Sequence, residues 1–204
     1  MPKVSDAHLT ARRRQILDAA ARCFARDGFH RTSMQDIVRE TGISAGLVYR
    51  YFDGKDAIIT AIVTEWHEQR RSALDPRRDT AGHPDEPSDL AASYLDLLRS
   101  VGRPQALEEL RLAVQVWAEA VRTPQIRELV RGGVDGPRLS AAELIRAEQA
   151  GGGFPPGLDP DAFARILIAV YQGLTLQTAW DDTVDNDAFV RTLETILGTL
   201  TARY

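Results

Sequence analysis

The 204-residue sequence predicts an all-α protein, with a small helical domain over residues 1–55 and a larger helical domain over residues 56–204. Apolar residues recur three and four positions apart in one segment after another, which is the spacing of the buried face of an amphipathic helix. Capping residues, glycines and prolines stand where helices usually begin and end. No segment alternates convincingly between apolar and polar residues, as a half-buried strand would.

Charge is unevenly divided along the chain. Residues 1–55 hold ten basic and six acidic side chains, a net charge of +4, whereas the other 149 residues hold 15 basic and 23 acidic ones, a net charge of −8. A basic N-terminal part on an acidic body indicates that one end meets a polyanion, although random scatter of surface charge explains the same numbers. The single cysteine, Cys23, excludes an intramolecular disulfide and suits a reducing compartment. No stretch reaches membrane-spanning length without polar breaks, so we expect a cytoplasmic protein without a membrane partner.

Three helices are expected in the N-terminal part, over residues 10–27, 33–41 and 44–52. The first ends at a glycine. The second is capped by Thr32 or Ser33, and Ser33 forms a capping-box pattern with the acidic residue three positions later. It ends at Gly42 with a left-handed cap. Short helices joined by a glycine turn are typical of a helix-turn-helix DNA-binding domain.

The third helix has an inward and an outward face. Val48 and Phe52 are four residues apart, so they share the inward face. Small residues on the other face let the backbone of a recognition helix approach the base pairs of the major groove, where Arg50 can pair with a guanine edge. Tyr49 and Tyr51 can reach phosphates or bases, or they are half-buried packing residues. The predicted outward face consists of Ala45, Gly46, Tyr49 and Arg50.

Residues 24–59 (FARDGFHRTSMQDIVRETGISAGLVYRYFDGKDAII) resemble the DNA-binding domain of the TetR family of transcriptional regulators. One departure is Val38, where the family usually has alanine, and its extra methyl groups must fit against the third helix. The resemblance is strong over about residues 10–60. The matching positions are Phe24, Gly28, Thr32, Ile37, Gly42, Ser44, Gly46, Tyr49, Tyr51, Phe52 and Lys55.

The resemblance implies a set of DNA-contacting residues. Lys55, at the start of the next helix, is also placed to bind a backbone phosphate with help from the helix dipole. The run of three arginines at 12–14 either reaches phosphates or the minor groove, or is a solvated helix start. The implied contacts come from Thr32, Ser33, Gln35, Ser44, Ala45, Gly46, Tyr49, Arg50, Tyr51 and Lys55.

The rest of the chain predicts six further helices, and a loop over residues 75–88 separates the first of them from the second. The run GGVDGP at 132–137 has three glycines and a proline, so we expect it to kink or interrupt its helix. The expected helices cover residues 55–74, 89–101, 104–121, 124–150, 160–180 and 186–203.

Two kinds of site are expected in this helical body. Aromatic residues from four helices are expected to converge with Gln172 on a pocket for a small molecule, unless they form a plain core. The segment 164–180 is apolar around most of its circumference, which predicts burial against a second subunit or in the centre of a monomeric core. The predicted pocket residues are Trp66, Tyr94, Trp117, Tyr171 and Gln172. The predicted dimer interface consists of Phe163, Leu167, Leu174, Thr178, Phe189, Leu193, Ile196 and Leu200.

Signals for catalysis are weak. The four histidines are scattered without metal-ligand spacing, and no glycine-rich phosphate loop follows a strand pattern, so we expect no enzyme, no cofactor and no metal. The expected function is a homodimeric repressor that binds a palindromic double-stranded DNA operator and is released by an unknown small apolar or aromatic effector. Two alternatives stay open: a DNA-binding regulator whose body only dimerises or docks a protein, and an enzyme in the body with accessory DNA binding.

Overall fold

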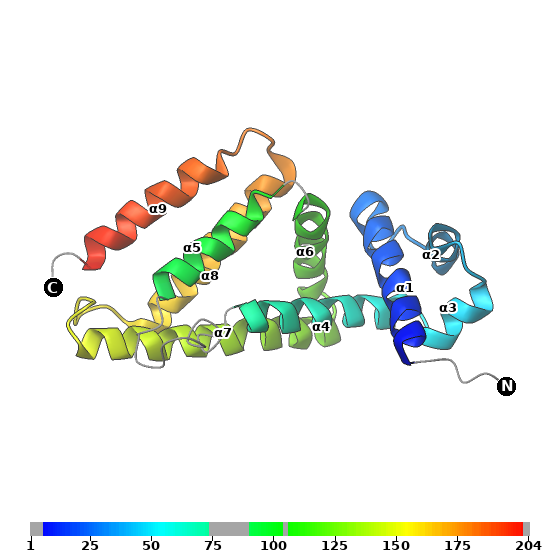
Figure 1. The fold of residues 1–204 in the computed structure, drawn as a ribbon, viewed down its shortest axis with the longest axis horizontal. Helices are drawn as coiled ribbons and strands as arrows, with labels where there is room; N and C mark the ends of the chain where they lie inside the picture. Colours follow the sequence, from blue (N-terminus) through cyan, green and yellow to red (C-terminus); the bar gives the residue numbers. More distant parts are fainter. Residues whose placement is uncertain (1–5, 74–89, 104–105, 202–204) are drawn as a thin grey trace.

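In the computed structural model, every described element is a helix, as the sequence predicts (Figure 1). The structure describes residues 6–73, 90–103 and 106–201, and no strand occurs within these ranges. The predicted loop over 75–88 therefore lies outside the described residues. The helices are α1 (Asp6–Asp27), α2 (Met34–Thr41), α3 (Ala45–Tyr51), α4 (Lys55–Ala73), α5 (Leu90–Val101), α6 (Leu107–Ala120), α7 (Pro124–Ala150), α8 (Pro160–Trp180) and α9 (Asn186–Thr201).

The helices α1, α2 and α3 form the predicted helix-turn-helix unit at one end of the molecule (Figure 1). Ser33 caps α2: its hydroxyl accepts the N–H of Asp36 at 3.2 Å, and the Asp36 carboxylate accepts the N–H of Ser33 at 2.9 Å. The predicted capping box is therefore confirmed. Gly42 ends α2 with a φ of 67°, a left-handed conformation that costs glycine no side-chain clash. Ile37 and Val48 are fully buried and pack α2 and α3 into the first apolar core, which α1 shares.

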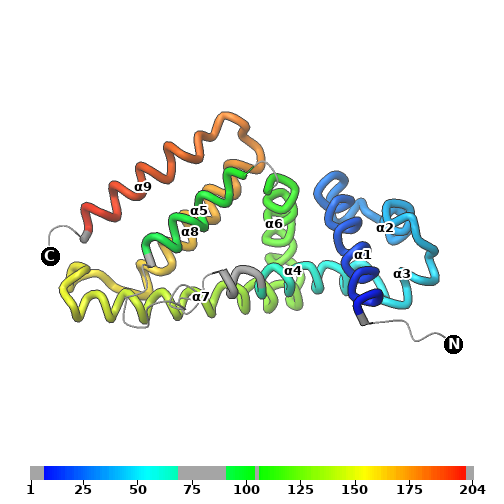
Figure 2. The backbone as a smooth tube through the Cα atoms, in the orientation of Figure 1, coloured from blue at the N-terminus to red at the C-terminus, as the bar shows by residue number. Residues whose placement is uncertain are grey.

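The remaining helices form an elongated body beside this unit (Figures 1 and 2). α4 leads away from α3 and packs along α7, whereas α6 stands between α1 and the rest of the body. α6 contacts α1, α7 and α8, so it joins the helix-turn-helix unit to two long helices of the body. α4 and α6 are therefore two separate structural connections between the body and α1.

The sequence predicts a kink or an interruption of α7 at the run GGVDGP. The interruption is absent, because α7 is continuous from Pro124 to Ala150 with Pro137 inside it. Pro137 removes one helical hydrogen bond, to the carbonyl of Gly133. Contacts of α7 with α4, α6 and α8 outweigh that loss. A Cβ at Gly133 would lie 2.0 Å from Nε2 of His67, so the glycine lets the His67 ring on α4 lie against the α7 backbone.

Two apolar cores lie under these helices. The first combines residues of α1, α2, α3 and α4 with Leu112 and Val116 of α6 and Ile126 of α7. The second combines residues of α5, α6, α7, α8 and α9. Because the first core contains residues from both sides of residue 55, the helix-turn-helix unit packs directly on the body.

Three residues of the predicted dimer interface lie on the inward face of α8. Leu174 is completely buried in the second core, and Phe163 and Leu167 are nearly so. These three side chains pack against their own chain and offer little surface to a second subunit. Of the other five predicted interface residues, Ile196 is exposed, whereas Thr178, Phe189, Leu193 and Leu200 are half-buried.

Candidate nucleic-acid interface

The helix α3 has the two faces that the sequence predicts. Val48 is fully buried and Phe52, directly after the helix, is 6% exposed, whereas the opposite face is open to solvent. A Cβ added to Gly46 would meet no atom within 4 Å, so packing inside the chain does not require a glycine at this position. A small residue there instead leaves the helix backbone accessible to another molecule. The exposed residues of α3 are Ala45, Gly46, Tyr49 and Arg50.

The two tyrosines of α3 differ in their surroundings. Tyr49 exposes 49% of its surface, which leaves its hydroxyl available for a partner. Tyr51 is half-buried and packs against the first core, which agrees with the alternative that it is a packing residue. Ser33, Gln35 and Ser44, at the starts of α2 and α3, are exposed. Ser44 stands at the N-cap of α3, yet its side chain makes no capping hydrogen bond.

Thr32 and Lys55 have structural contacts that the sequence did not indicate. Thr32 is only 2% exposed, and its hydroxyl lies 2.8 Å from the carbonyl oxygen of Gly28. Its side chain is therefore closed off from DNA in this conformation. The Lys55 Nζ donates to the carbonyls of Phe29 at 2.9 Å and of His30 and Thr32 at 3.3 Å, and lies 4.8 Å from the centre of the Phe29 ring. Lys55 thus fastens the loop between α1 and α2, and its phosphate contact stays a prediction.

Two family models match the chain. A model described as bacterial regulatory proteins, tetR family, matches residues 16–62. A second, described as BetI-type transcriptional repressor, C-terminal, matches residues 87–202, which is more than half of the chain. The chain belongs to the TetR family. It is therefore a DNA-binding transcriptional regulator.

Curated relatives carry regulator names. The chain is 37% identical to the HTH-type transcriptional repressor Rv1474c of Mycobacterium tuberculosis over 107 residues, which cover 50% of this chain and 57% of that protein. It is 26% identical to the HTH-type transcriptional regulator UidR of Escherichia coli over 186 residues, which cover 91% of each chain.

Two solved structures share the whole fold. Salmonella enterica GusR superposes with a TM-score of 0.75 at 27% identity, covering 98% of this chain and all of that one. A transcriptional regulator from Saccharomonospora viridis, solved in complex with choline, superposes with a TM-score of 0.74 at 26% identity, covering 92% of this chain and 96% of that one.

The arginine run at 12–14, which lies inside α1 rather than at its start, is engaged within the chain of this TetR-family protein. Arg13 and Arg14 both pair with Glu65 of α4, Arg14 at 3.1 Å, and Arg14 also pairs with Asp18 at 2.8 Å. Arg12 donates to a glutamine of its own helix. Two residues of the run hold α1 against α4, and its contact with phosphates or the minor groove stays a prediction.

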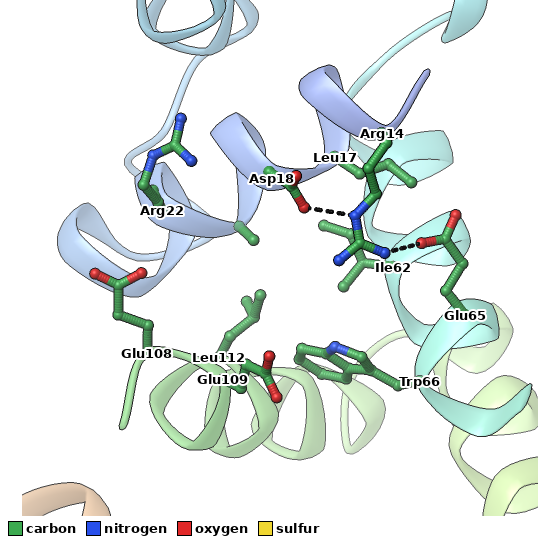
Figure 3. Close-up of a pocket in the computed structure, with 11 residues that line it drawn as sticks. Arg14, Leu17, Asp18, Arg22, Ile62, Glu65, Trp66, Glu108, Glu109 and Leu112 are labelled. Carbon is green, nitrogen blue, oxygen red and sulfur yellow. Dashed lines mark hydrogen bonds and ion pairs between the residues drawn. The ribbon is translucent and has the colours of Figure 1, made fainter. Parts of the chain in front are cut away.

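A cavity of about 240 Å³ lies at this joint, between α1, α4 and α6 (Figure 3). Aliphatic side chains and the Trp66 indole line part of it, and charged groups line the rest. The Arg14 and Arg22 guanidinium groups are already paired with carboxylates. The acidic residues of α6 at the cavity lie in its first turn, where the helix dipole favours negative charge. The lining consists of Arg14, Leu17, Asp18, Ala21, Arg22, Ile62, Glu65, Trp66, Glu108, Glu109 and Leu112.

The predicted pocket residues are not gathered at one place among the described residues. Trp66 lines the joint cavity and packs against the first core, whereas Tyr94 and Tyr171 belong to the second. The Tyr94 hydroxyl donates to the carbonyl of Leu167 at 2.6 Å, and its burial raises the pKa of Tyr94. Tyr94 is therefore a hydrogen-bonded core residue, as the alternative expected. Trp117 and Gln172 are half-buried, and neither lines the joint cavity.

Sequence reasoning missed the polar contacts between α6 and the α1–α2 loop. Gln115 of α6 donates to the carbonyl of Phe24 at 2.9 Å and accepts the N–H of Phe29 at 3.0 Å. One turn later, a carboxylate oxygen of Glu119 lies 2.8 Å from Nε2 of His30. These partners are 86 or more residues apart in sequence, and no local pattern links them.

Other kinds of site find no support in the described residues. They contain no group of three or more histidine, cysteine, aspartate or glutamate side chains that could hold a metal ion. None of the described helices is long and apolar enough to cross a membrane.

Proposed function

We propose that the protein is a homodimeric repressor that places two copies of α3 in successive major-groove turns of a palindromic operator. The outward face of α3 carries this proposal. It combines two small residues, an exposed tyrosine and an exposed arginine on a helix whose other face is buried. A relative named as a repressor, and the match to the BetI-type repressor model, favour repression. No enzymatic role is proposed, because these relatives are regulators.

Replacing Arg50 tests whether the outward face of α3, here called the reading face, recognises specific base pairs. A duplex selected from random DNA by the wild-type protein serves as operator, and each base pair of a half-site is varied in turn. We expect Arg50→Ala to bind the selected duplex more weakly, by about 1–3 kcal/mol, and to lose its preference at one base pair per half-site. Arg131→Ala is the matched control, since Arg131 is an exposed arginine of α7 with surface ion pairs only. Unchanged base preference in Arg50→Ala would contradict the proposed reading face.

The dimer surface is proposed on the outward face of α8, in place of the residues that the structure buries. Ile166, Ala169, Gly173, Leu176 and Trp180 follow one another at alternating spacings of three and four, the spacing of a helix–helix seam. Ile166 and Trp180 expose 55% and 67% of their surfaces, although both are large apolar residues. A Cβ added to Gly173 would meet no atom within 4 Å, so a partner helix can come close there.

A substitution in this seam tests directly whether α8 forms the dimer interface. We expect Ile166→Lys to lower the dimer content, because it would place a charge in an apolar contact. Sedimentation velocity of the wild type and the variant at equal concentration measures the dimer content of each. Arg165→Lys, an exposed change one position away, is the control. A variant that stays as dimeric as the wild type would remove α8 from the proposed interface.

An effector is proposed to bind in the body and to favour a spacing of the recognition helices that does not fit the operator. Thr175 supports a ligand in the second core, because its hydroxyl is completely buried and has no hydrogen-bond partner among the described residues. A ligand with a polar group would satisfy it. The choline complex shows that one relative of similar fold takes a small molecule.

A second candidate is a regulator whose body dimerises without a small molecule. The described cavity favours it, because charged pairs line much of that cavity rather than an apolar wall. Titrating the protein–operator complex with choline and with simple aromatic compounds separates the two. Saturable release of DNA by a compound supports an effector in the second core if Thr175→Val abolishes the release. Thr192→Val is the control and is expected to keep the release, because Thr192 is an exposed residue of α9. No release by any compound supports the second candidate.

A further inference from the structure

The segment that joins α1 to α2 is held by two helices of the body at once. At Phe29, the N–H donates to Gln115 of α6 at 3.0 Å, and the carbonyl accepts from Lys55, the first residue of α4, at 2.9 Å. The backbone N–H and the backbone carbonyl of Phe29 therefore both hydrogen-bond to side chains of body helices. The position of this segment depends on α4 and α6 together.

Gln115 makes both of its hydrogen bonds to backbone groups. Its amide nitrogen donates to the carbonyl of Phe24 in the last turn of α1, and its amide oxygen accepts the N–H of Phe29 just beyond the helix. Backbone partners cannot rotate away as side chains do. A single planar amide therefore fixes the end of α1 in both distance and orientation relative to α6.

The other side of α6 faces the body. α6 packs on α7 and α8, and α8 carries the proposed dimer seam. A shift of α8 therefore reaches the end of α1 through α6, without passing along α4. In Figure 1, α6 stands between α1 and the helices α5 and α8.

We propose that Gln115 is a positioning residue that fixes the separation of the two recognition helices by clamping the end of α1 to α6. The inference rests on the proposed dimer and palindrome. It adds a specific role for α6: the clamp makes the dimer intolerant of operators with the wrong half-site spacing. Without the clamp, each helix-turn-helix unit turns more freely on the body and reaches half-sites at several spacings.

Operators of altered spacing test the clamp. The selected palindrome is compared with versions that carry one base pair more or one fewer between the half-sites, and with a duplex that holds a single half-site. We expect the wild type to prefer the original spacing by roughly 5- to 150-fold, the usual range of coupling between sites. Gln115→Leu is expected to reduce this preference to less than about threefold while binding the single half-site as the wild type does.

The controls separate clamping from general damage to the fold. Gln115→Asn keeps an amide but is one methylene too short to reach both backbone groups, so it is expected to lose the spacing preference as well. Gln125→Leu changes an exposed glutamine of α7 and is expected to keep it. A variant that was only less stable would lose affinity for every duplex alike.

Two results would overturn the inference, and they are distinguishable. If the wild type discriminates between spacings and both Gln115 variants discriminate equally well, the clamp is wrong and the palindrome-binding dimer stands. If the wild type binds all spacings and the single half-site equally, the proposed dimer on a palindrome fails and the clamp fails with it.

Discussion

Replacing Lys55 distinguishes a role in binding DNA phosphates from a role in fastening the α1–α2 loop. The sequence predicts a phosphate contact, whereas the structure places its ammonium on three carbonyls of the α1–α2 loop. Lys55→Met keeps most of the apolar stem and removes the charge and the hydrogen bonds. The two roles predict different results for the same variant, one in stability and the other in the salt dependence of DNA binding.

The expected loss of stability follows from the contacts. A hydrogen bond to a charged group contributes about 1.5–3 kcal/mol, and a partly exposed cation–π contact contributes about 0.5–1 kcal/mol. The three bonds share one half-buried ammonium group, so their contributions do not add in full. We expect Lys55→Met to lower the free energy of unfolding by about 2–3 kcal/mol. For a chain of this length, that corresponds to a Tm about 4–12 °C lower.

The salt slope reports phosphate contacts separately. Each phosphate neutralised by the protein contributes about −0.9 to the slope of log K against log salt concentration, so two lysines in a dimer would contribute about −1.8. We expect the slope of Lys55→Met, measured well below its Tm, to equal that of the wild type. Arg39→Met is the control for thermal unfolding, since Arg39 is highly exposed and makes one surface ion pair within α2. A variant that melts like the wild type, with a slope smaller by about 1.8, would refute the structural role.

Three further expectations concern the elements that position the interface. Gly42→Ala is expected to lower the free energy of unfolding by about 1–2 kcal/mol in urea melts, because the residue has a φ of 67°; an equal stability would show that α2 ends differently. Tyr94→Phe is expected to lower it by about 1 kcal/mol and to leave operator affinity unchanged, because one buried hydrogen bond is lost. The Thr123 hydroxyl and then His30 hold the pKa of Glu119 below its ordinary value of 4.5, so the contribution of Glu119 to stability is present above that value and is lost as pH falls through the lower folded-state pKa. Urea titrations from pH 7 to pH 3 are expected to show this acid loss in the wild type and a smaller one in Glu119→Gln.

The sequence predicted the helix-turn-helix unit well because local patterns determine most of it. The capping box at Ser33, the left-handed Gly42 and the pairing of Val48 with Phe52 each depend on residues within four positions of one another. The continuous α7 shows the limit of local rules. Its proline weakens the helix locally, but packing against three other helices stabilises it.

The candidate site was predicted only in part, because residue types alone do not show which partner a polar group finds. An exposed lysine at a helix start and a lysine fastened to three carbonyls have the same sequence signature. The same holds for Gln115, whose residue type gives no sign that its amide links α6 to α1. Both residues bind backbone groups of the same segment, which lies at the end of α1 where the recognition unit meets the body. That segment has the contacts needed to transmit a movement of either α4 or α6 to the recognition helix. Binding measurements with Lys55 and Gln115 replaced singly and together would therefore reveal coupling between the two connections, as a double-mutant free energy that differs from the sum of the single changes.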